Sequence, residues 1–265
     1  MILDAHNHLH QVPDPAAAIA LMRRSGILGC VVNGTSENDW PQVAALARSH
    51  PDFVLPSFGL HPWYAHHRTS GWFDSLRRHL DLFPHAVIGE CGLDRWVAEP
   101  ALETQRAVFL PQLRLARERS LPLTLHVLKA WDALFSAFEE EPPPATGFLL
   151  HSFGGSAETA ARAARLGARF SFSGYFLHAR KASLIPVFQG LPRDRIMLET
   201  DAPAMTPPPE FITHPMEDAA NHPANLPSIA RGFAGAMGID FHELLRDCLQ
   251  NARAFFDPTH QVFPS

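Results

Sequence analysis

The chain has 265 residues, of which 46% are hydrophobic and 18% are charged, a balance that is ordinary for a globular protein with a substantial core. Its net charge of -5 argues against a broad basic surface for nucleic acid. No apolar run approaches the roughly 20 residues that span a bilayer, and the first residues lack the basic and apolar regions of a signal peptide. We therefore expect a cytoplasmic protein without a membrane partner or an obligate protein partner.

Short apolar or β-branched runs alternate with longer stretches of helical spacing, which is the pattern of βαβ units. The predicted strands are residues 1–6, 27–33, 53–59, 86–90, 122–127, 147–151, 168–173 and 195–200. The predicted helices are residues 15–25, 38–49, 71–83, 102–120, 130–140, 157–166, 179–190, 226–237 and 241–255. Eight such units predict an α/β fold of the TIM (β/α)8 barrel type, as a single domain over residues 1–265.

Local signals support the helix starts and mark one long loop. Asp14 before Pro15, and Ser156 before Ala157, are expected helix caps. Residues 202–221 follow the eighth strand without helical or strand periodicity, and loops of this length are usually functional or disordered. We expect this loop to shape a substrate site, although the sequence leaves the role of residues 205–220 open.

The first strand ends in Asp4-Ala5-His6-Asn7-His8. Alternate residues of a strand point to one side, so Asp4, His6 and His8 are expected to share a face. His6 and His8 would then bind one metal ion together. Two histidines at this spacing are not specific, because capping or surface histidines follow the same pattern. The 16 histidines of the chain are a high number for its length, and we expect some of them to be ligands.

Further ionisable residues stand at the ends of other predicted strands. They are His61 after the third strand, Glu90 in the fourth, His126 in the fifth, His151 in the sixth and Asp201 after the eighth. Each has an ordinary structural explanation, such as a turn cap, a partner for arginine or a buried hydrogen-bonded histidine. Together they occupy the C-terminal rim, where barrel enzymes carry their active sites, and the joint pattern favours a metal site.

The number of ligands predicts two ions. The six candidates are His6, His8, Glu90, His126, His151 and Asp201. A catalytic zinc that keeps an open position needs fewer groups. With Glu90 as the bridging carboxylate, the six would hold two divalent ions, and such pairs suit the hydrolysis of phosphate esters or amides. Mixed nitrogen and oxygen ligands do not distinguish zinc, manganese and magnesium. The three cysteines are odd in number and widely spaced, which argues against disulfides and a Cys-rich zinc site.

Six motifs occur in one order along residues 1 to about 256. They are Asp4-Ala5-His6-Asn7-His8, Gly59-Leu60-His61-Pro62, Gly89-Glu90-Cys91-Gly92-Leu93-Asp94, Leu121-Pro122-Leu123-Thr124-Leu125-His126, His151-Ser152-Phe153-Gly154-Gly155-Ser156 and Leu198-Glu199-Thr200-Asp201-Ala202-Pro203. This series resembles the motifs of the TatD-related hydrolases. The resemblance implies a metal-dependent TIM-barrel hydrolase, and the studied members of that family are mostly deoxyribonucleases that trim DNA from the 3′ end.

The resemblance also implies roles for single residues. His6, His8 and Asp201 would hold the first metal, His126 and His151 the second, and Glu90 would bridge both. His61 would contact a substrate phosphate. Two positions depart from the pattern: Arg95-Trp96 stand where many relatives have tyrosines, and Lys129 stands where many have arginine.

Both departures lie on the presumed substrate side and leave the substrate open. We expect Lys129 and Arg95 to help His61 hold a phosphate, and Asp4, Asp94 and Glu199 to orient ligands. Trp63 and Trp96 follow catalytic strand ends, where they are core or loop packing or stack on a base.

Our leading hypothesis is a two-metal phosphodiesterase acting on DNA, in which Asp201 positions or deprotonates the attacking water. Asp201 and Glu90 are the expected catalytic residues. A small-molecule amidohydrolase or esterase on the same site is the rival enzyme, because one barrel serves many substrates. A glutamate on the fourth strand, where the wider group often has a modified lysine, favours the first reading. The complete ligand set argues against a binding scaffold without turnover.

Overall fold

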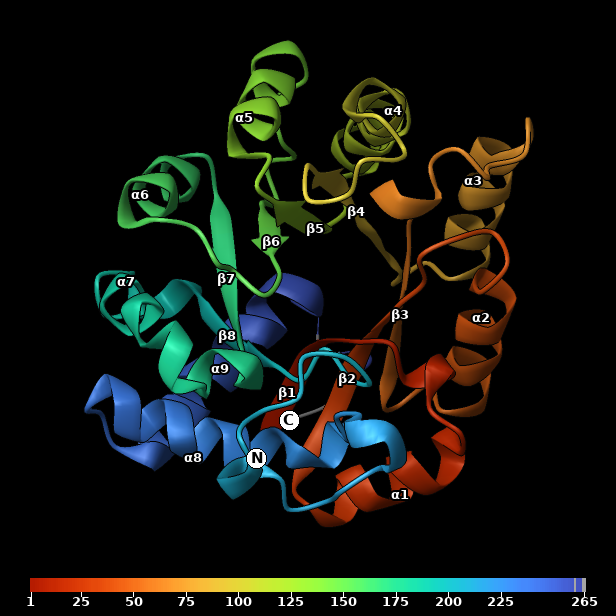
Figure 1. The fold of residues 1–265 in the computed structure, drawn as a ribbon. Coiled ribbons are helices and arrows are strands. Elements are labelled where there is room, and N and C mark those ends of the chain that lie inside the picture. Colours follow the sequence, from red (N-terminus) through yellow and green to blue (C-terminus); the bar gives the residue numbers. More distant parts are fainter. Residues whose placement is uncertain (260, 264–265) are drawn as a thin grey trace.

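The computed structural model describes residues 1–259 and 261–263, and eight parallel strands in it form one sheet in the order β1 to β8. The strands are β1 (Ile2–Asn7), β2 (Ile27–Asn33), β3 (Val54–Phe58), β4 (Val87–Asp94), β5 (Leu123–Leu128), β6 (Phe148–Leu150), β7 (Ala168–Ser173) and β8 (Ile196–Glu199). The sheet curls into a barrel with helices around it (Figure 1). The predicted TIM barrel is confirmed.

The helices connect successive strands and then cover the barrel. They are α1 (Pro15–Arg24), α2 (Trp40–Ser49), α3 (Trp72–Leu82), α4 (Leu102–Arg119), α5 (Trp131–Glu140), α6 (Ala157–Arg165), α7 (Ile185–Gln189), α8 (Leu226–Met237) and α9 (Phe241–Phe256). Both expected caps are present. The Asp14 carboxylate accepts a hydrogen bond from the backbone N–H of Ala17 at 2.9 Å, and Ser156 Oγ accepts one from the N–H of Thr159 at 3.1 Å. Within the described residues, no helix combines the length and apolar character needed to cross a bilayer.

The helix predicted over residues 179–190 is wrong as a single element. The chain forms a 3₁₀ helix over Ala179–Leu184 and then the short α7. Pro186 gives the physical reason, because it has no N–H to donate to a carbonyl one turn earlier and therefore suits the start of a new helix.

Strand β4 is longer than the predicted 86–90. It continues to pair with β5 from Cys91 to Asp94. Gly92 permits the close approach, since its φ is +140° and a Cβ there would lie 2.0 Å from the carbonyl oxygen of His126. The two glycines of β4 interrupt the alternation of apolar residues, so the sequence pattern does not show where the strand ends.

The barrel closes where β8 meets β1. The backbone N–H of Asp201 donates to the carbonyl of His6 at 3.0 Å. The Asp4 carboxylate accepts hydrogen bonds from the backbone N–H and the hydroxyl of Thr200, at 2.9 and 2.6 Å. These contacts join the first and last motifs across almost 200 residues.

The N-terminal end of the barrel interior is apolar. Leu3, Ala5, Val31, Leu55, Val87, Leu149 and Met197 from the strands form one cluster with Ala252, Phe255, Phe256, Val262 and Phe263. Gly29 makes room for this packing, because a Cβ there would lie 2.4 Å from the ring of Phe263. The end of α9 and the segment that follows it therefore close this end of the barrel.

The loop after β8 is anchored at its ends. The side-chain amide of Asn221 donates to the carbonyl of Thr200 at 2.8 Å, and the Asn225 side chain accepts from the backbone N–H of His214 at 2.8 Å. Two short 3₁₀ turns, Pro209–Phe211 and Glu217–Ala219, lie within it.

Candidate metal centre

Five histidines and two carboxylates meet at the C-terminal end of the barrel. They are His6 from β1, His8 directly after it, His61 after β3, Glu90 from β4, His126 from β5, His151 after β6 and Asp201 after β8. His6 is fully buried and Glu90 is 3% exposed. Closure of the barrel is what gathers them, since each comes from a different part of the chain.

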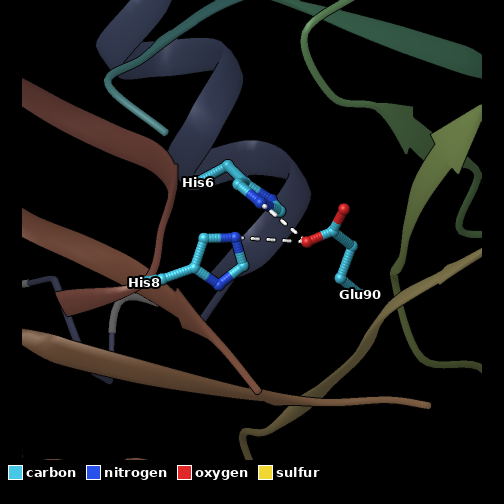
Figure 2. A group of neighbouring side chains, drawn as sticks. All are labelled: His6, His8 and Glu90. Atoms are coloured by element: carbon cyan, nitrogen blue, oxygen red, sulfur yellow. Dashed lines mark ion pairs between the residues drawn. The ribbon is translucent and has the colours of Figure 1, made fainter. Parts of the chain in front are cut away.

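Glu90 lies between two groups of imidazoles. Its Oε2 is 3.3 Å from His6 Nε2 and 3.2 Å from His8 Nε2, and Figure 2 shows both rings directed at this oxygen. Its Oε1 is 3.1 Å from His126 Nδ1 and 2.8 Å from His151 Nε2. The two oxygens of one carboxylate thus face separate sets of nitrogen donors.

Asp201 completes the first set. Its Oδ1 lies 3.5 Å from His6 Nε2 and 3.4 Å from His8 Nε2. The backbone of Asp201 has φ of +53°, an uncommon conformation for a non-glycine residue and one that clusters at functional sites.

His61 stands among the second set. Its Nε2 is 3.2 Å from Glu90 Oε1, and its ring is 4.5 Å from that of His126. Its Nδ1 accepts a hydrogen bond from the backbone N–H of Trp63 at 3.2 Å. The family resemblance implies that His61 contacts a substrate phosphate. Its ring nitrogen is nevertheless as close to Glu90 as the nitrogens of the expected metal ligands are.

Outer partners set which nitrogen of two histidines faces the centre. His8 Nδ1 donates to the carbonyl of Asn33 at 2.8 Å, which turns Nε2 inward. His126 Nε2 donates to Asp94 Oδ2 at 2.9 Å, which turns Nδ1 inward. Metal-binding histidines typically have such a partner on the ring nitrogen that does not bind the metal.

Glu199 lies behind His151. One of its oxygens is 3.8 Å from His151 Nδ1 and accepts hydrogen bonds from the N–H and hydroxyl of Ser152, both at 2.6 Å. Its other oxygen accepts from the Ser171 hydroxyl. Sequence reasoning missed Asn33, Ser152 and Ser171; the available signal for Ser171 was a polar residue between the phenylalanines of β7.

The electrostatics of the cluster balance burial against opposite charge. Burial lowers the pKa of His8, but hydrogen bonds to Asp201 and Glu90 outweigh burial and raise it to about 10. The pKa of Glu90 is held well below its usual range because the charges of surrounding imidazoles, His151 foremost, outweigh burial. Burial lowers the pKa of His61 to about 4. Carboxylates and imidazoles at these distances each favour the charged form of the other.

The arrangement fits a divalent cation. Three sets of donor atoms each lie within 4.8 Å of one another: His6, His8 and Glu90; His6, His151 and Glu199; and His61, Glu90 and His126. Within the described part of the chain, neither ring nitrogen of the buried His6 has a hydrogen-bond partner. An unpaired buried polar atom is costly, and a cation on His6 Nε2 would remove that cost.

The other predicted substrate residues lie at the rim. Arg95 makes two 2.8 Å hydrogen bonds to the exposed carboxylate of Asp132. Lys129 Nζ lies 4.0 Å from the centre of the Trp96 ring. Both cations thus make these contacts with exposed groups.

The chain is similar to known proteins along most of its length. The family model described as TatD related DNase matches residues 3–257. The "3'-5' ssDNA/RNA exonuclease TatD" of Erwinia tasmaniensis is 32% identical over 250 residues, covering 92% of this chain and 94% of the relative. The "Uncharacterized metal-dependent hydrolase YabD" of Bacillus subtilis is 29% identical, covering 97% and 99%.

A solved structure shares the fold along nearly the whole chain. The crystal structure of YjjV, a TatD homologue from Escherichia coli, superposes with a TM-score of 0.86 at 26% identity and covers 97% of this chain and 98% of that one. The shared fold and a family match over almost every described residue lead to one assignment. The chain belongs to the family of TatD-related DNases, which are metal-dependent hydrolases.

Proposed function

We propose that this chain is a divalent-metal-dependent phosphodiesterase that shortens single-stranded DNA or RNA from the 3′ end. The observation that carries the proposal is the position of Glu90, whose two carboxylate oxygens each lie about as close to imidazole nitrogens as hydrogen-bonded atoms do. A carboxylate placed in this way suits a bridge between two cations. The relatives named as exonucleases support the choice of substrate.

The residues divide into two sets around that bridge. His6, His8 and Asp201 would hold one ion together with Glu90 Oε2. His126 and His151 would hold the other together with Glu90 Oε1. Zinc, manganese and magnesium are the candidate ions, and when bound they would polarise the phosphoryl group and lower the pKa of a water molecule.

Four side chains would act on the substrate or on the attacking water. Asp201 would accept the proton of the attacking water, because its carboxylate lies beside the nitrogens of His6 and His8 that would hold the ion. His61 would contact the phosphate. Lys129 and Arg95 would contact the nucleotide chain farther out, and Arg95 would have to exchange its exposed pairing with Asp132 for a phosphate.

Asp4, Asp94 and Glu199 would support this arrangement. Asp94 and Glu199 would orient His126 and His151 through their second nitrogens. Asp4 would act through the backbone, since its carboxylate binds Thr200 and thereby holds the end of β8 against β1.

A substrate panel tests the proposal. Protein loaded with Mg²⁺, Mn²⁺ or Zn²⁺ is offered 3′-labelled and 5′-labelled single strands, the corresponding duplex, bis(p-nitrophenyl) phosphate, and a set of amides and lactones. We expect stepwise shortening from the 3′ end, abolished by EDTA and by Asp201→Asn. Asp81→Asn is the matched control, because it removes an exposed carboxylate that is paired with Arg119 outside the cluster.

Elemental analysis of the purified, reloaded protein tests the ion count, with two ions per chain expected. Turnover of an amide or lactone in the absence of any phosphodiester cleavage would replace the proposal with the rival amidohydrolase. A single ion per fully active chain would contradict the bridging role of Glu90.

A further inference from the structure

Two tryptophans lie exposed beside the metal centre. Trp63 is 44% exposed in the short 3₁₀ turn after β3, and Trp96 is 65% exposed just after β4. By contrast, Trp40 is fully buried and Trp72 is 8% exposed, both in the helical layer. Exposed indoles at the mouth of a site are apolar surface that packing does not explain.

Both tryptophans are hydrogen-bonded to Asp94, the carboxylate that orients His126. The indole N–H of Trp63 donates to Asp94 Oδ2 at 2.7 Å, and the backbone N–H of Trp96 donates to Asp94 Oδ1 at 2.6 Å. Asp94 Oδ2 also accepts from His126 Nε2. The Trp63 ring therefore has a fixed orientation relative to the metal centre before any substrate arrives.

The Trp63 ring stands on edge against the histidines of the centre. Its centroid is 5.0 Å from that of His61 at 81°, and 5.8 Å from that of His126 at 70°. A phosphate at His61 would thus lie within a nucleotide's length of a partly exposed indole face. Lys129 lies over Trp96 and adds a positive charge to the same rim.

The overall charge makes such local contacts necessary. At a net charge of -5, the chain has no general attraction for a polyanion. Base stacking on an aromatic ring provides affinity that does not depend on charge, and every base has a face to offer. Bases of a duplex already stack on each other, so an indole at the rim is available only to an unpaired base.

We propose that Trp63 is the stacking platform for the nucleobase next to the scissile phosphate and makes the site selective for unpaired ends, with Trp96 and Lys129 contacting the adjoining nucleotide. This inference rests on the proposed phosphodiesterase function. Trp63 is a specificity-determining residue, and the bond from its indole N–H to Asp94 also makes it a positioning residue for His126.

The test compares two single-stranded oligonucleotides that differ only in whether the 3′-terminal nucleotide carries a base. For the unchanged protein, we expect the abasic end to raise KM by about 10-fold or more, the equivalent of one lost stacking contact. Trp63→Ala should raise KM for the normal end to the same extent and show no further loss with the abasic end. Trp63→Phe should keep KM within about threefold, and because it loses the N–H bond to Asp94 its defect should fall on kcat.

Leu82→Ala is the matched control, because it removes an exposed apolar side chain at the opposite end of the barrel. Equal KM values for normal and abasic ends in the unchanged protein would overturn the platform and leave the phosphodiesterase standing. So would a Trp63→Ala variant whose KM rises equally on both oligonucleotides.

Binding of the same oligonucleotides in EDTA, followed by fluorescence anisotropy, separates the two proposals. Protein that cleaves no phosphodiester contradicts the proposed function. Weaker binding of the abasic strand that disappears in Trp63→Ala then supports the platform by itself, and equal binding of both strands overturns it.

Discussion

The two ends of the barrel interior are formed by the same eight strands but differ in the kind of side chain that they bury. At the N-terminal end, Phe255, Phe256 and Phe263 pack on strand residues such as Leu3 and Met197. At the C-terminal end, His6 and Glu90 are buried as deeply, and among the residues that the structure describes neither nitrogen of His6 has a hydrogen-bond partner. Apolar burial stabilises the fold without further partners, whereas buried polar groups need compensating charge. Within the barrel interior, the apolar end therefore stabilises the fold, and the polar end holds the groups of the proposed chemistry.

Glu90→Gln should have the largest effect on the C-terminal end. Removing the charge between five imidazoles should lower kcat/KM on single-stranded DNA with Mn²⁺ by about 10³-fold or more, since several kcal/mol of charge stabilisation are lost. The amide is of similar shape, so circular dichroism should report an intact fold. Asp81→Asn, which removes an exposed carboxylate outside the cluster, should retain activity. A kcat/KM of Glu90→Gln within tenfold of that of the unchanged protein would refute the bridging role of this carboxylate.

Phe256→Ala should act on the N-terminal end and leave the chemistry alone. Phe256 is 4% exposed, and truncating a buried phenylalanine costs about 3–5 kcal/mol. Urea unfolding should show this loss in the free energy of unfolding, while kcat/KM of the folded fraction stays the same. Leu82→Ala, on an exposed position, should change the free energy little. A large loss of activity with unchanged stability would mean that the two ends are coupled.

Asp94→Asn should have an intermediate effect. The hydrogen bond from His126 Nε2 to Asp94 sets the orientation of His126, and losing such a partner typically costs about 10–100-fold in metal affinity or activity. Calorimetric titration with Mn²⁺ measures the affinity. Asp39→Asn provides the comparison, because Asp39 is paired with His10 at 3.5 Å outside the cluster. Equal effects of the two variants would argue against orientation through Asp94.

A change of pH should alter the metal affinity of the C-terminal end, and this is the smallest of the expected effects. Without metal, the pKa of His8 is raised to about 10 because hydrogen bonds to Asp201 and Glu90 outweigh burial, so this ring is protonated at pH 7. A metal ligand must be neutral, and binding should therefore release protons. Affinity should rise by up to about tenfold per pH unit for each proton released. Calorimetry at pH 7 in buffers of different ionisation enthalpy counts the protons; none released would contradict this charge state.

The strand ends and their ionisable residues could be predicted because both follow from local rules. Alternation and β-branching mark strands such as Ile27–Asn33 and Ala168–Ser173, whose bounds agree with the structure. In a parallel barrel every strand ends at the same rim, so residues after strand ends must meet. Once the barrel was inferred, His6, Glu90 and Asp201 had to lie close together.

Other features depend on neighbours that no local pattern reveals. The pairing of Arg95 with Asp132, and the contacts of Ser152 and Ser171 with Glu199, link separate strand ends and helices. Such pairings depend on distances of a few ångströms between side chains, and chain spacing does not encode those distances.

The sequence by itself determined the fold class, the order of the motifs and the chemical types of the groups at the rim, because periodicity and residue chemistry are local properties. Only the tertiary structure decided which oxygen of Glu90 each histidine faces, and that Trp63 shares a carboxylate with His126. The reason is barrel closure: the bonds from Thr200 to Asp4 join the ends of β8 and β1, almost 200 residues apart in the chain, and the geometry of the centre exists only after that junction forms.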